Sequence, residues 1–246
     1  MLKSLAMETA ASTAPRPLRL TLCLLTWNEI DGCRHDVPKL PLDQFEEVFA
    51  VDGGSKDGTV EYLRSLGITV HQQSRPGYNQ AYHCAFDKCT TDALILFHPK
   101  GGIDPSSVTR FRSLLANGYD LVIASRMARG ARNEEDDSLW RPRKWFVQGL
   151  GLLSWLLWGR RGPVIWDPLH GMRAMRRERF WAIDPLPTGL SIDLEMVVRS
   201  YRLGFKATEF PIVENVRLEG KTHFAALPTG KRLLGYLWRE LKRKAS

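Results

Sequence analysis

The sequence predicts one α/β domain built on a doubly wound, mostly parallel sheet, and three observations support this. Short apolar segments with β-prone residues alternate with amphipathic segments over the first half of the chain. Strands that alternate with helices at this spacing are typical of a parallel sheet covered on both faces. Polar, glycine-rich turns follow several of the apolar segments. With 246 residues, 43% of them hydrophobic, the chain can bury one core of ordinary size.

The expected elements follow one another in a regular order. Strands are predicted at residues 18–25, 45–51, 68–71, 93–97 and 120–124. Helices are predicted after the second strand, at residues 80–88, and from Asp104 to Leu115, where Asp104 suits the N-cap and Pro105 the first helical position. Ligands of such sheets bind beyond the carboxyl ends of the strands, and this is where Asn28, Asp52 and His98 fall.

The turn after the second strand begins with Asp52 and two glycines, the second of which is Gly54. A carboxylate beside a backbone without side chains can approach a ribose or a base. The same residues also suit an ordinary β-turn before a helix that Asp57 or Thr59 caps. Asn28-Glu29 and Arg75-x-Gly77 are expected at the same crevice, and this convergence favours a nucleotide site.

Six motifs appear in an order that resembles family 2 glycosyltransferases of GT-A fold, and among them the dolichyl-phosphate mannose synthase-like polyprenyl-phosphate sugar transferases. The resemblance spans roughly residues 18–221. The motifs are Thr26-Trp27-Asn28-Glu29, residues 51–59, Ala124-Ser125-Arg126, residues 167–173, Glu195 with residues 204–211, and residues 217–221. Each motif is weak alone, but six in order are specific.

The resemblance implies a role for each matching residue. Six residues would contact the donor: Asn28, Glu29, Asp52, Gly54, Arg75 and His98. Arg126 and Arg173 would face phosphate groups, and Arg217 the acceptor phosphate or a mobile loop. Asp167 could orient an arginine or the sugar. Asp193 and Glu195 diverge on a helix, and we assign Asp193 to the helix cap and Glu195 to the cleft, although the reverse assignment is open.

The chain departs from the family where the Asp-x-Asp motif should follow the fourth strand. The sequence there is His98-Pro99-Lys100, so both carboxylates that would hold Mg²⁺ or Mn²⁺ are missing. A hard cation prefers oxygen ligands, and a lysine would repel it. We therefore expect no metal site. Either Lys100 supplies the positive charge to the diphosphate, which we favour, or the domain binds a nucleotide sugar without catalysis.

Two segments combine large apolar residues with basic ones. Residues 141–161 carry four tryptophans or phenylalanines between basic ends, and residues 227–246 form a basic amphipathic helix with Leu233, Leu234, Leu237, Trp238 and Leu241 on one face. Tryptophan and arginine together suit the headgroup region of a bilayer, so both segments are predicted to lie on a membrane surface. A buried core helix and a docked C-terminal helix are the alternatives.

The remaining features limit the class of protein. Residues 1–17 are expected to form a disordered tail without a signal peptide, and the GT-A domain to span residues 18–226. The net charge of +8 indicates an anionic partner, but no nucleic-acid-binding module is recognisable. The four cysteines form no zinc or disulfide pattern. A cytoplasmic protein on the inner face of a membrane fits these features.

We therefore expect a hexosyltransferase that uses a UDP- or GDP-sugar and a phosphorylated acceptor. The acceptor that we favour is a polyprenyl phosphate. We also expect an integral-membrane partner protein. Two alternatives stay open. One is a non-catalytic nucleotide-sugar-binding domain that regulates a partner, and the other is a soluble transferase with a small phosphorylated acceptor.

Overall fold

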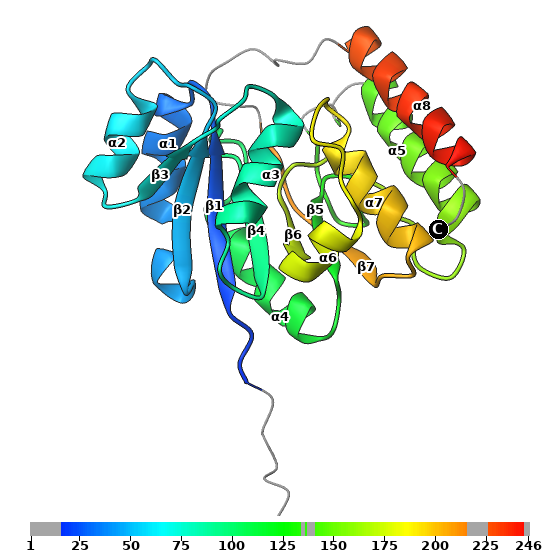
Figure 1. The fold of residues 1–246 in the computed structure, drawn as a ribbon, viewed down its shortest axis with the longest axis horizontal. Coiled ribbons are helices and arrows are strands. Elements are labelled where there is room, and N and C mark those ends of the chain that lie inside the picture. Colours follow the sequence, from blue (N-terminus) through cyan, green and yellow to red (C-terminus); the bar gives the residue numbers. More distant parts are fainter. Residues whose placement is uncertain (1–15, 134–135, 137–140, 216–225, 244–246) are drawn as a thin grey trace, which may run out of the picture.

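The computed structural model describes residues 16–133, 136, 141–215 and 226–243. Arg217 and nearly all of the predicted disordered tail therefore lie outside the described residues. Within them, seven strands form one sheet in the order β3-β2-β1-β4-β6-β5-β7 (Figure 1). The strands are β1 (Leu20–Thr26), β2 (Glu47–Asp52), β3 (Thr69–Gln72), β4 (Ala93–Phe97), β5 (Leu121–Ser125), β6 (Arg173–Arg176) and β7 (Ala207–Pro211).

The pairing is parallel except around β6, which runs antiparallel to β4 and β5. The predicted mostly parallel sheet is thus confirmed. The five strands predicted from the sequence are present, each within two residues of its expected ends. The carboxyl ends of β1, β2 and β4 meet at one edge, because these three strands are parallel neighbours.

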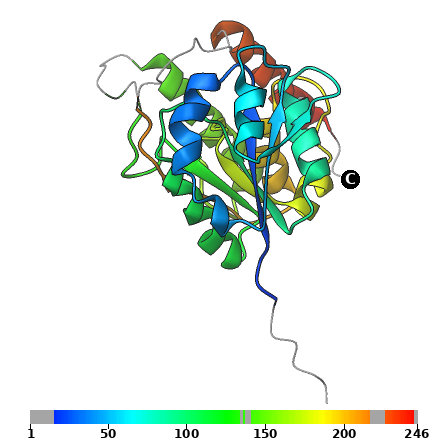
Figure 2. The same ribbon diagram turned by 90° about the vertical axis from the view of Figure 1, so that its left-hand side faces the viewer.

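Helices cover both faces of the sheet, as Figure 2 shows. One face carries α1 (Ile30–Asp36), α2 (Thr59–Ser65) and α4 (Arg110–Ala116), whose apolar side chains pack on alternate residues of β1. The other face carries α3 (Tyr78–Lys88), α6 (Arg177–Ala182) and α7 (Ile192–Arg202). Short 3-10 turns at Val37–Lys39, Leu42–Gln44 and Pro105–Thr109 complete the connections, and the Asp104 side chain accepts a hydrogen bond from the Ser106 amide as predicted for a cap.

A further layer of two helices packs on the outside of α7. These are α5 (Pro142–Ser154), continued by a π-helical turn at Trp155–Gly159, and α8 (Ala226–Lys242). Leu150 of α5, Leu194 and Val198 of α7, and Leu233 and Leu237 of α8 form their own apolar cluster. The helix predicted at the C-terminus therefore docks on the domain.

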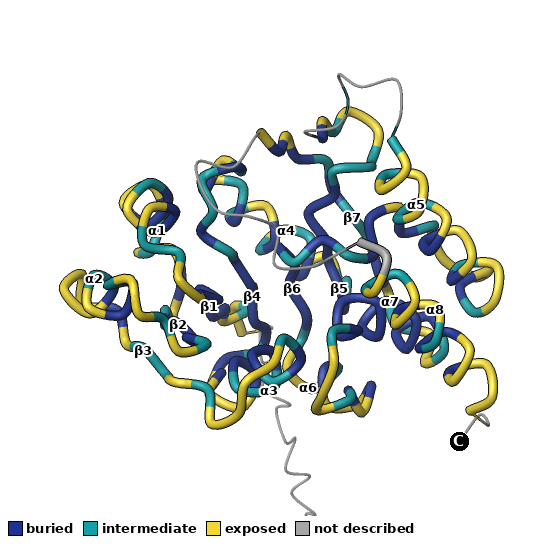
Figure 3. The backbone as a smooth tube through the Cα atoms, turned by 90° about the horizontal axis from the view of Figure 1, so that it is seen from above, coloured by how far each residue is buried: buried dark blue, intermediate teal, exposed yellow. Residues whose placement is uncertain are grey.

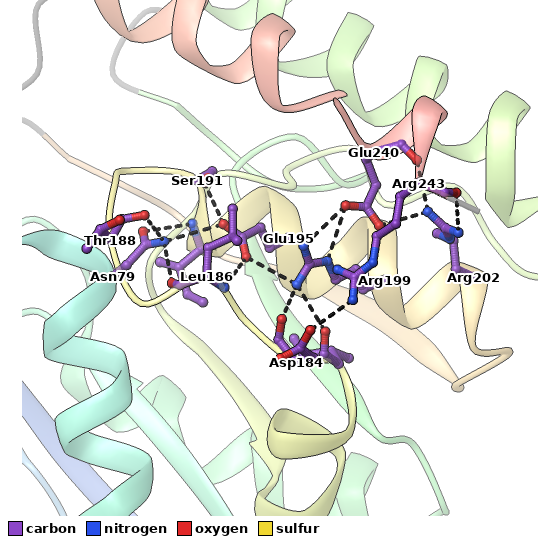
Figure 4. A network of polar contacts seen from close by, with 12 residues as sticks. Asn79, Asp184, Leu186, Thr188, Ser191, Glu195, Arg199, Arg202, Glu240 and Arg243 are labelled. Atoms are coloured by element: carbon purple, nitrogen blue, oxygen red, sulfur yellow. Dashed lines mark hydrogen bonds and ion pairs between the residues drawn. The ribbon is translucent and has the colours of Figure 1, made fainter. Parts of the chain in front are cut away.

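Buried ion pairs connect α8 to α7 (Figure 4). Glu240 is 3% exposed and accepts from Arg199 and Arg202, with Nη–Oε distances of 3.2 and 2.8 Å. Arg243 pairs with Asp184 at the rim at 2.8 Å. Because a buried carboxylate is costly unless it is paired, this arrangement fixes the position of α8 along α7.

The outer sides of the two helices remain exposed (Figure 3), and many of their exposed side chains are large and apolar. The predicted single apolar face of α8 is in fact divided: Leu233 and Leu237 are buried, whereas Leu234, Trp238 and Leu241 are exposed. On α5 and its π-helical turn the exposed large side chains are Trp145, Phe146, Leu152, Leu153, Leu156 and Leu157. Within the described residues, no helix combines the length and the apolar character that crossing a bilayer requires.

Candidate active site

The loops after β1 and β2 are joined by hydrogen bonds from side chains to backbone groups. Asn28, whose φ is 53°, accepts from the Lys56 amide at 2.8 Å and donates its own amide to Ser55 Oγ at 2.7 Å. Asp57 accepts from the Ile30 amide at 3.0 Å and also from the Thr59 amide. The N-cap of α2 is Gly58, so neither Asp57 nor Thr59 holds the predicted cap position. These contacts hold two predicted donor-binding loops in one rigid unit.

Asp52 lies at the centre of this unit and is fully buried. One carboxylate oxygen accepts from the Gly54 and Ser55 amides at 2.8 Å, and the other accepts from Thr26 Oγ1 at 2.9 Å. Gly54 has a φ of +97°, which favours glycine at this position. Asp52 therefore shapes the turn, and its direct contact with a nucleotide stays a prediction, as does that of Arg75, which is exposed before α3.

The loop after β4 packs directly on α1. A Cβ at Gly32 would lie 2.0 Å from the Pro99 carbonyl oxygen, so only glycine permits this approach. Asp36, which is 1% exposed, accepts from the Gly101 amide at 2.8 Å. Lys100 Nζ lies 3.8 Å from Glu29 Oε1. The loop thus fixes Lys100 at the edge where β1 and β4 end, beside the predicted donor-binding unit.

The residues at this position do not fit a divalent cation. His98 and Lys100 replace the oxygen ligands that Mg²⁺ or Mn²⁺ would need, and the ammonium group is next to the nearest carboxylate, Glu29. Among the described residues, no three His, Cys, Asp or Glu side chains come together as a metal cluster.

A cavity of about 710 Å³ opens between this loop and helices α5 and α8. Cationic side chains line part of it, namely Lys100, Arg126, Arg143, Lys144 and Lys231. Apolar side chains line most of the rest, among them Ile103, Phe146, Val147, Leu169, Leu233 and Leu234. The site is therefore amphiphilic, with the sheet edge at one end and the outer pair of helices at the other.

Arg126 enters the cavity at the end of β5 and is held by two carboxylates. Its Nε and Nη2 donate to Asp167 at 2.8 and 3.0 Å, and its Nη1 donates to Glu214 at 3.2 Å. Burial alone would raise the pKa of Asp167, but Arg126 keeps it below the ordinary value. The predicted role of Asp167 in orienting an arginine agrees with this geometry. Glu214, which lies in no motif, was not predicted.

Glu209 on β7 supports the same turn from behind. Its Oε2 accepts from the amides of Trp166 and Asp167 at 3.0 and 3.2 Å. Burial raises the pKa of this carboxyl to about 7. Glu209 belongs to the Glu-x-Pro motif, but its support of Asp167 was not predicted.

Two of the predicted site residues that do not line the cavity are buried in the domain, Arg173 and Glu195. Arg173 was expected to meet a phosphate, but it is fully buried and donates to the carbonyl oxygens of Pro168, His170 and Asp193. The expectation is wrong because Arg173 begins the central strand β6, where its long side chain folds inward and ties together the turn before the strand.

The assignments of Asp193 and Glu195 are also reversed. Glu195 is fully buried and accepts from Ser191 Oγ at 2.5 Å and from the Leu186 amide at 2.8 Å (Figure 4). Asp193 makes no cap; it lines the cavity, accepts from the hydroxyls of Tyr78 and Tyr82 at 2.8 and 2.6 Å, and pairs with Arg173 at 3.1 Å. Divergence on the helix was expected, but its direction depends on packing that the sequence does not show.

His98 lies against the turn that precedes β6. A Cβ at Gly171 would be 2.6 Å from His98 Cε1 and 3.3 Å from the Tyr78 hydroxyl. Gly171 therefore lets the loop after β4 and the turn at residues 167–171 share one wall of the cavity. Of the predicted site residues, His98, Lys100 and Arg126 line the cavity. Glu29 pairs with Lys100 and Asp167 with Arg126. Their roles in donor and acceptor binding stay predictions.

Comparisons with known proteins agree with this architecture. The model of the family described as glycosyl transferase family 2 matches residues 24–184. Glycosyltransferase AglJ of Haloferax volcanii is 27% identical over 94% of this chain and 73% of its own length. A dolichyl-phosphate hexose transferase of the same organism is 30% identical over 78% of this chain and 81% of its own length.

Among solved structures, glucosyl-3-phosphoglycerate synthase from Mycobacterium tuberculosis, in complex with Mn²⁺, UDP and glucosyl-3-phosphoglycerate, superposes with a TM-score of 0.68. It is 17% identical, and the match covers 93% of this chain and 82% of that one. At this identity the likeness concerns the fold alone, and the predicted GT-A fold is confirmed.

Proposed function

Because this chain belongs to glycosyltransferase family 2, and is therefore a glycosyltransferase, we propose that it transfers a hexose from a nucleotide sugar to a polyprenyl phosphate at a membrane surface. The observation that carries the proposal is the amphiphilic cavity. It joins a cluster of cations at the sheet edge to apolar walls on α5 and α8. A phosphate attached to a long hydrocarbon matches both parts of this lining.

In the proposed complex, the joined loops after β1 and β2 hold the nucleoside, and the diphosphate lies against Lys100. The lysine takes the place of a metal by providing a fixed positive charge for the leaving diphosphate. Its support by Gly32 and Asp36 argues for this role, because a charge acts best on a developing anion when it is already positioned. Transfer would then be independent of Mg²⁺ or Mn²⁺.

The chemical step is a single displacement at the anomeric carbon. An oxygen of the acceptor phosphate forms a bond to this carbon while the bond to the nucleoside diphosphate breaks, and the electron pair leaves with the diphosphate. A phosphomonoester with a second pKa of about 6 is mostly ionised at neutral pH, so no general base has to remove a proton. The cations of the cavity, including Arg126, reduce the repulsion between the two phosphate groups.

The outer sides of α5 and α8 provide the proposed contact with the membrane. Their exposed tryptophans and leucines lie on the two helices that also form the cavity wall, and the contact of Phe146 with Gly230 joins the helices there. Apolar side chains between basic ones suit the headgroup region. The protein would bind peripherally at the cytoplasmic face, where an integral-membrane partner could receive the lipid-linked product.

The test is a transfer assay with the full chain, liposomes that contain a polyprenyl phosphate, and a panel of UDP- and GDP-hexoses, in the presence of EDTA. We expect a lipid-linked hexose, formed at a rate that chelation does not change. Product that forms only with added Mg²⁺ or Mn²⁺ would contradict the role of Lys100. Tight nucleotide binding without turnover would favour a regulatory domain. Turnover of a small phosphorylated acceptor without liposome binding would favour a soluble transferase.

A further inference from the structure

His170 is a polar residue of the cavity wall that does not use its full hydrogen-bonding capacity. It is 5% exposed and lines the cavity, yet its Nδ1 is buried and has no hydrogen-bond partner within the described residues. A neutral imidazole carries one donor and one acceptor, and a buried polar nitrogen that lacks a partner costs free energy. An unpaired ring nitrogen in a cavity wall indicates that a ligand completes the site.

The hydrogen bonds that hold His170 in place are made by its backbone amide and carbonyl groups. The amide donates to the Asp167 carbonyl at 3.4 Å, and the carbonyl accepts from Arg173 Nε and Nη2 at 3.0 and 2.6 Å. Because Arg173 is fully buried and begins β6, it fixes this turn to the sheet. The main chain of His170 is thus fixed at the cavity, and the ring nitrogen Nδ1 has no partner among the described residues.

The surroundings of the ring keep it uncharged. Burial and the nearby Arg126 lower the pKa of His170 to about 4, against the opposing effect of Asp167 and Glu214. At neutral pH the ring can therefore both donate and accept a hydrogen bond. A phosphate dianion only accepts and is better served by the cations already present, whereas a hydroxyl group donates and accepts and so matches a neutral imidazole.

The position of the ring favours the transferred sugar as the source of that hydroxyl. Gly171 packs against His98, which places His170 beside the loop that carries Lys100. A hexose linked to a diphosphate at Lys100 would extend into the cavity at this point. Building on the proposed function, we infer that His170 binds a hydroxyl group of the transferred hexose and thereby helps to select the donor sugar.

Two variants separate hydrogen bonding from shape. His170→Gln retains a donor and an acceptor, and His170→Leu removes both. The probes are the UDP- or GDP-hexose that the wild type uses and its monodeoxy analogues. The wild type is expected to use one deoxy analogue about tenfold less efficiently than the parent in kcat/KM. His170→Leu should lose this discrimination, and His170→Gln should keep most of it. His83→Gln, outside the cavity lining, is the matched control.

A second measurement does not depend on turnover. The ring ¹⁵N resonances of His170, assigned by their loss in His170→Gln, should shift when the nucleotide sugar binds. A nucleoside diphosphate alone or inorganic phosphate should leave them unchanged. A shift with inorganic phosphate would show that the ring binds a phosphate, and no shift with any probe would show that water satisfies it. Either result overturns the inference.

The two proposals fail in different ways. If the wild type transfers a hexose and His170→Leu discriminates against every deoxy analogue as the wild type does, the role of His170 is wrong and the proposed function stands. If the wild type uses no nucleotide sugar and its His170 resonances do not respond to one, both are wrong.

Discussion

The proposed donor edge and the proposed acceptor side of this molecule are stabilised in opposite ways. At the donor edge, the loops after β1 and β2 are held by hydrogen bonds between small polar side chains and backbone amides, with Asp52 and Asp57 at the centre. On the proposed acceptor side, α5 and α8 pack on α7 through leucines, buried ion pairs join α8 to α7, and the two outer helices leave apolar surface exposed. Rigid polar loops suit a water-soluble ligand of fixed shape, and an exposed apolar layer suits a lipid.

The largest effect is expected where the two regions meet, at the Arg126–Asp167 pair. Asp167→Ala leaves the guanidinium of Arg126 with Glu214 as its one remaining carboxylate partner, and we expect a loss of about 3–5 kcal/mol in the free energy of unfolding. Urea unfolding followed by circular dichroism measures this. Asp87→Ala on α3 removes an exposed partner of Lys88 and should cost less than about 1 kcal/mol. Equal losses in the two variants would contradict the importance of burial.

The next effect concerns the charge at the donor edge. Lys100→Ala should reduce kcat by about 10²–10³-fold, because a positioned charge near the leaving group is lost. Lys88→Ala, an exposed lysine on α3, is the matched control and should change little. Steady-state rates with saturating donor provide the measurement. Full activity of the Lys100 variant would show that another group stabilises the diphosphate.

Glu209 predicts a pH dependence of stability. Its pKa is about 7 in the folded chain and 4.5 ordinarily, so the folded state keeps a proton that the unfolded state loses. Its contribution is complete below pH 4.5, falls as the pH rises towards 7, and is lost above 7, with a size of about 3 kcal/mol. His170, with its pKa lowered to about 4, acts in the opposite direction, since its contribution is lost as the pH falls from 6.5 to 4.

Glu209→Gln should therefore reveal the effect of His170. Between pH 4.5 and 6.5 the two contributions oppose each other in the wild type, and the variant should gain stability with rising pH more steeply than the wild type does. Thermal unfolding in a series of buffers measures the difference. Parallel pH profiles would contradict the raised pKa of Glu209.

The smallest effect is expected at the exposed apolar side of α8, which is the proposed contact with the membrane. Trp238→Ser should weaken binding to anionic liposomes about tenfold, because the exposed indole no longer enters the headgroup region. Leu66→Ser changes an exposed apolar residue directly after α2, far from α8 in the fold, and should leave liposome binding as it is. Co-sedimentation measures both. Equal binding by Trp238→Ser and the wild type would exclude this side of α8 as the contact.

The sequence predicted five of the seven described strands and the sheet edge at which His98 and Lys100 lie, because alternating patterns and turn residues are local signals. It did not predict β6 and β7. It failed for Arg173 and Glu195, whose direction depends on which neighbours fill the space around them. It also did not predict the support of Asp167 by Glu209 or of Arg126 by Glu214. These contacts join residues about 40 to 90 positions apart, and no local pattern records them.

The ion pairs of Glu240 connect α8, the proposed membrane contact, to the helix that carries Asp193 in the cavity lining. Glu240 on α8 holds Arg199 on α7, and the same helix carries Asp193 at the cavity. The exposed apolar side of α8 and the position of Asp193 are thus set by one rigid pair of helices. If α8 rests on a bilayer, this pair of helices sets the distance between the cavity and the surface of the bilayer. An acceptor would then be selected by how far its phosphate stands from the hydrocarbon, as well as by its chemistry.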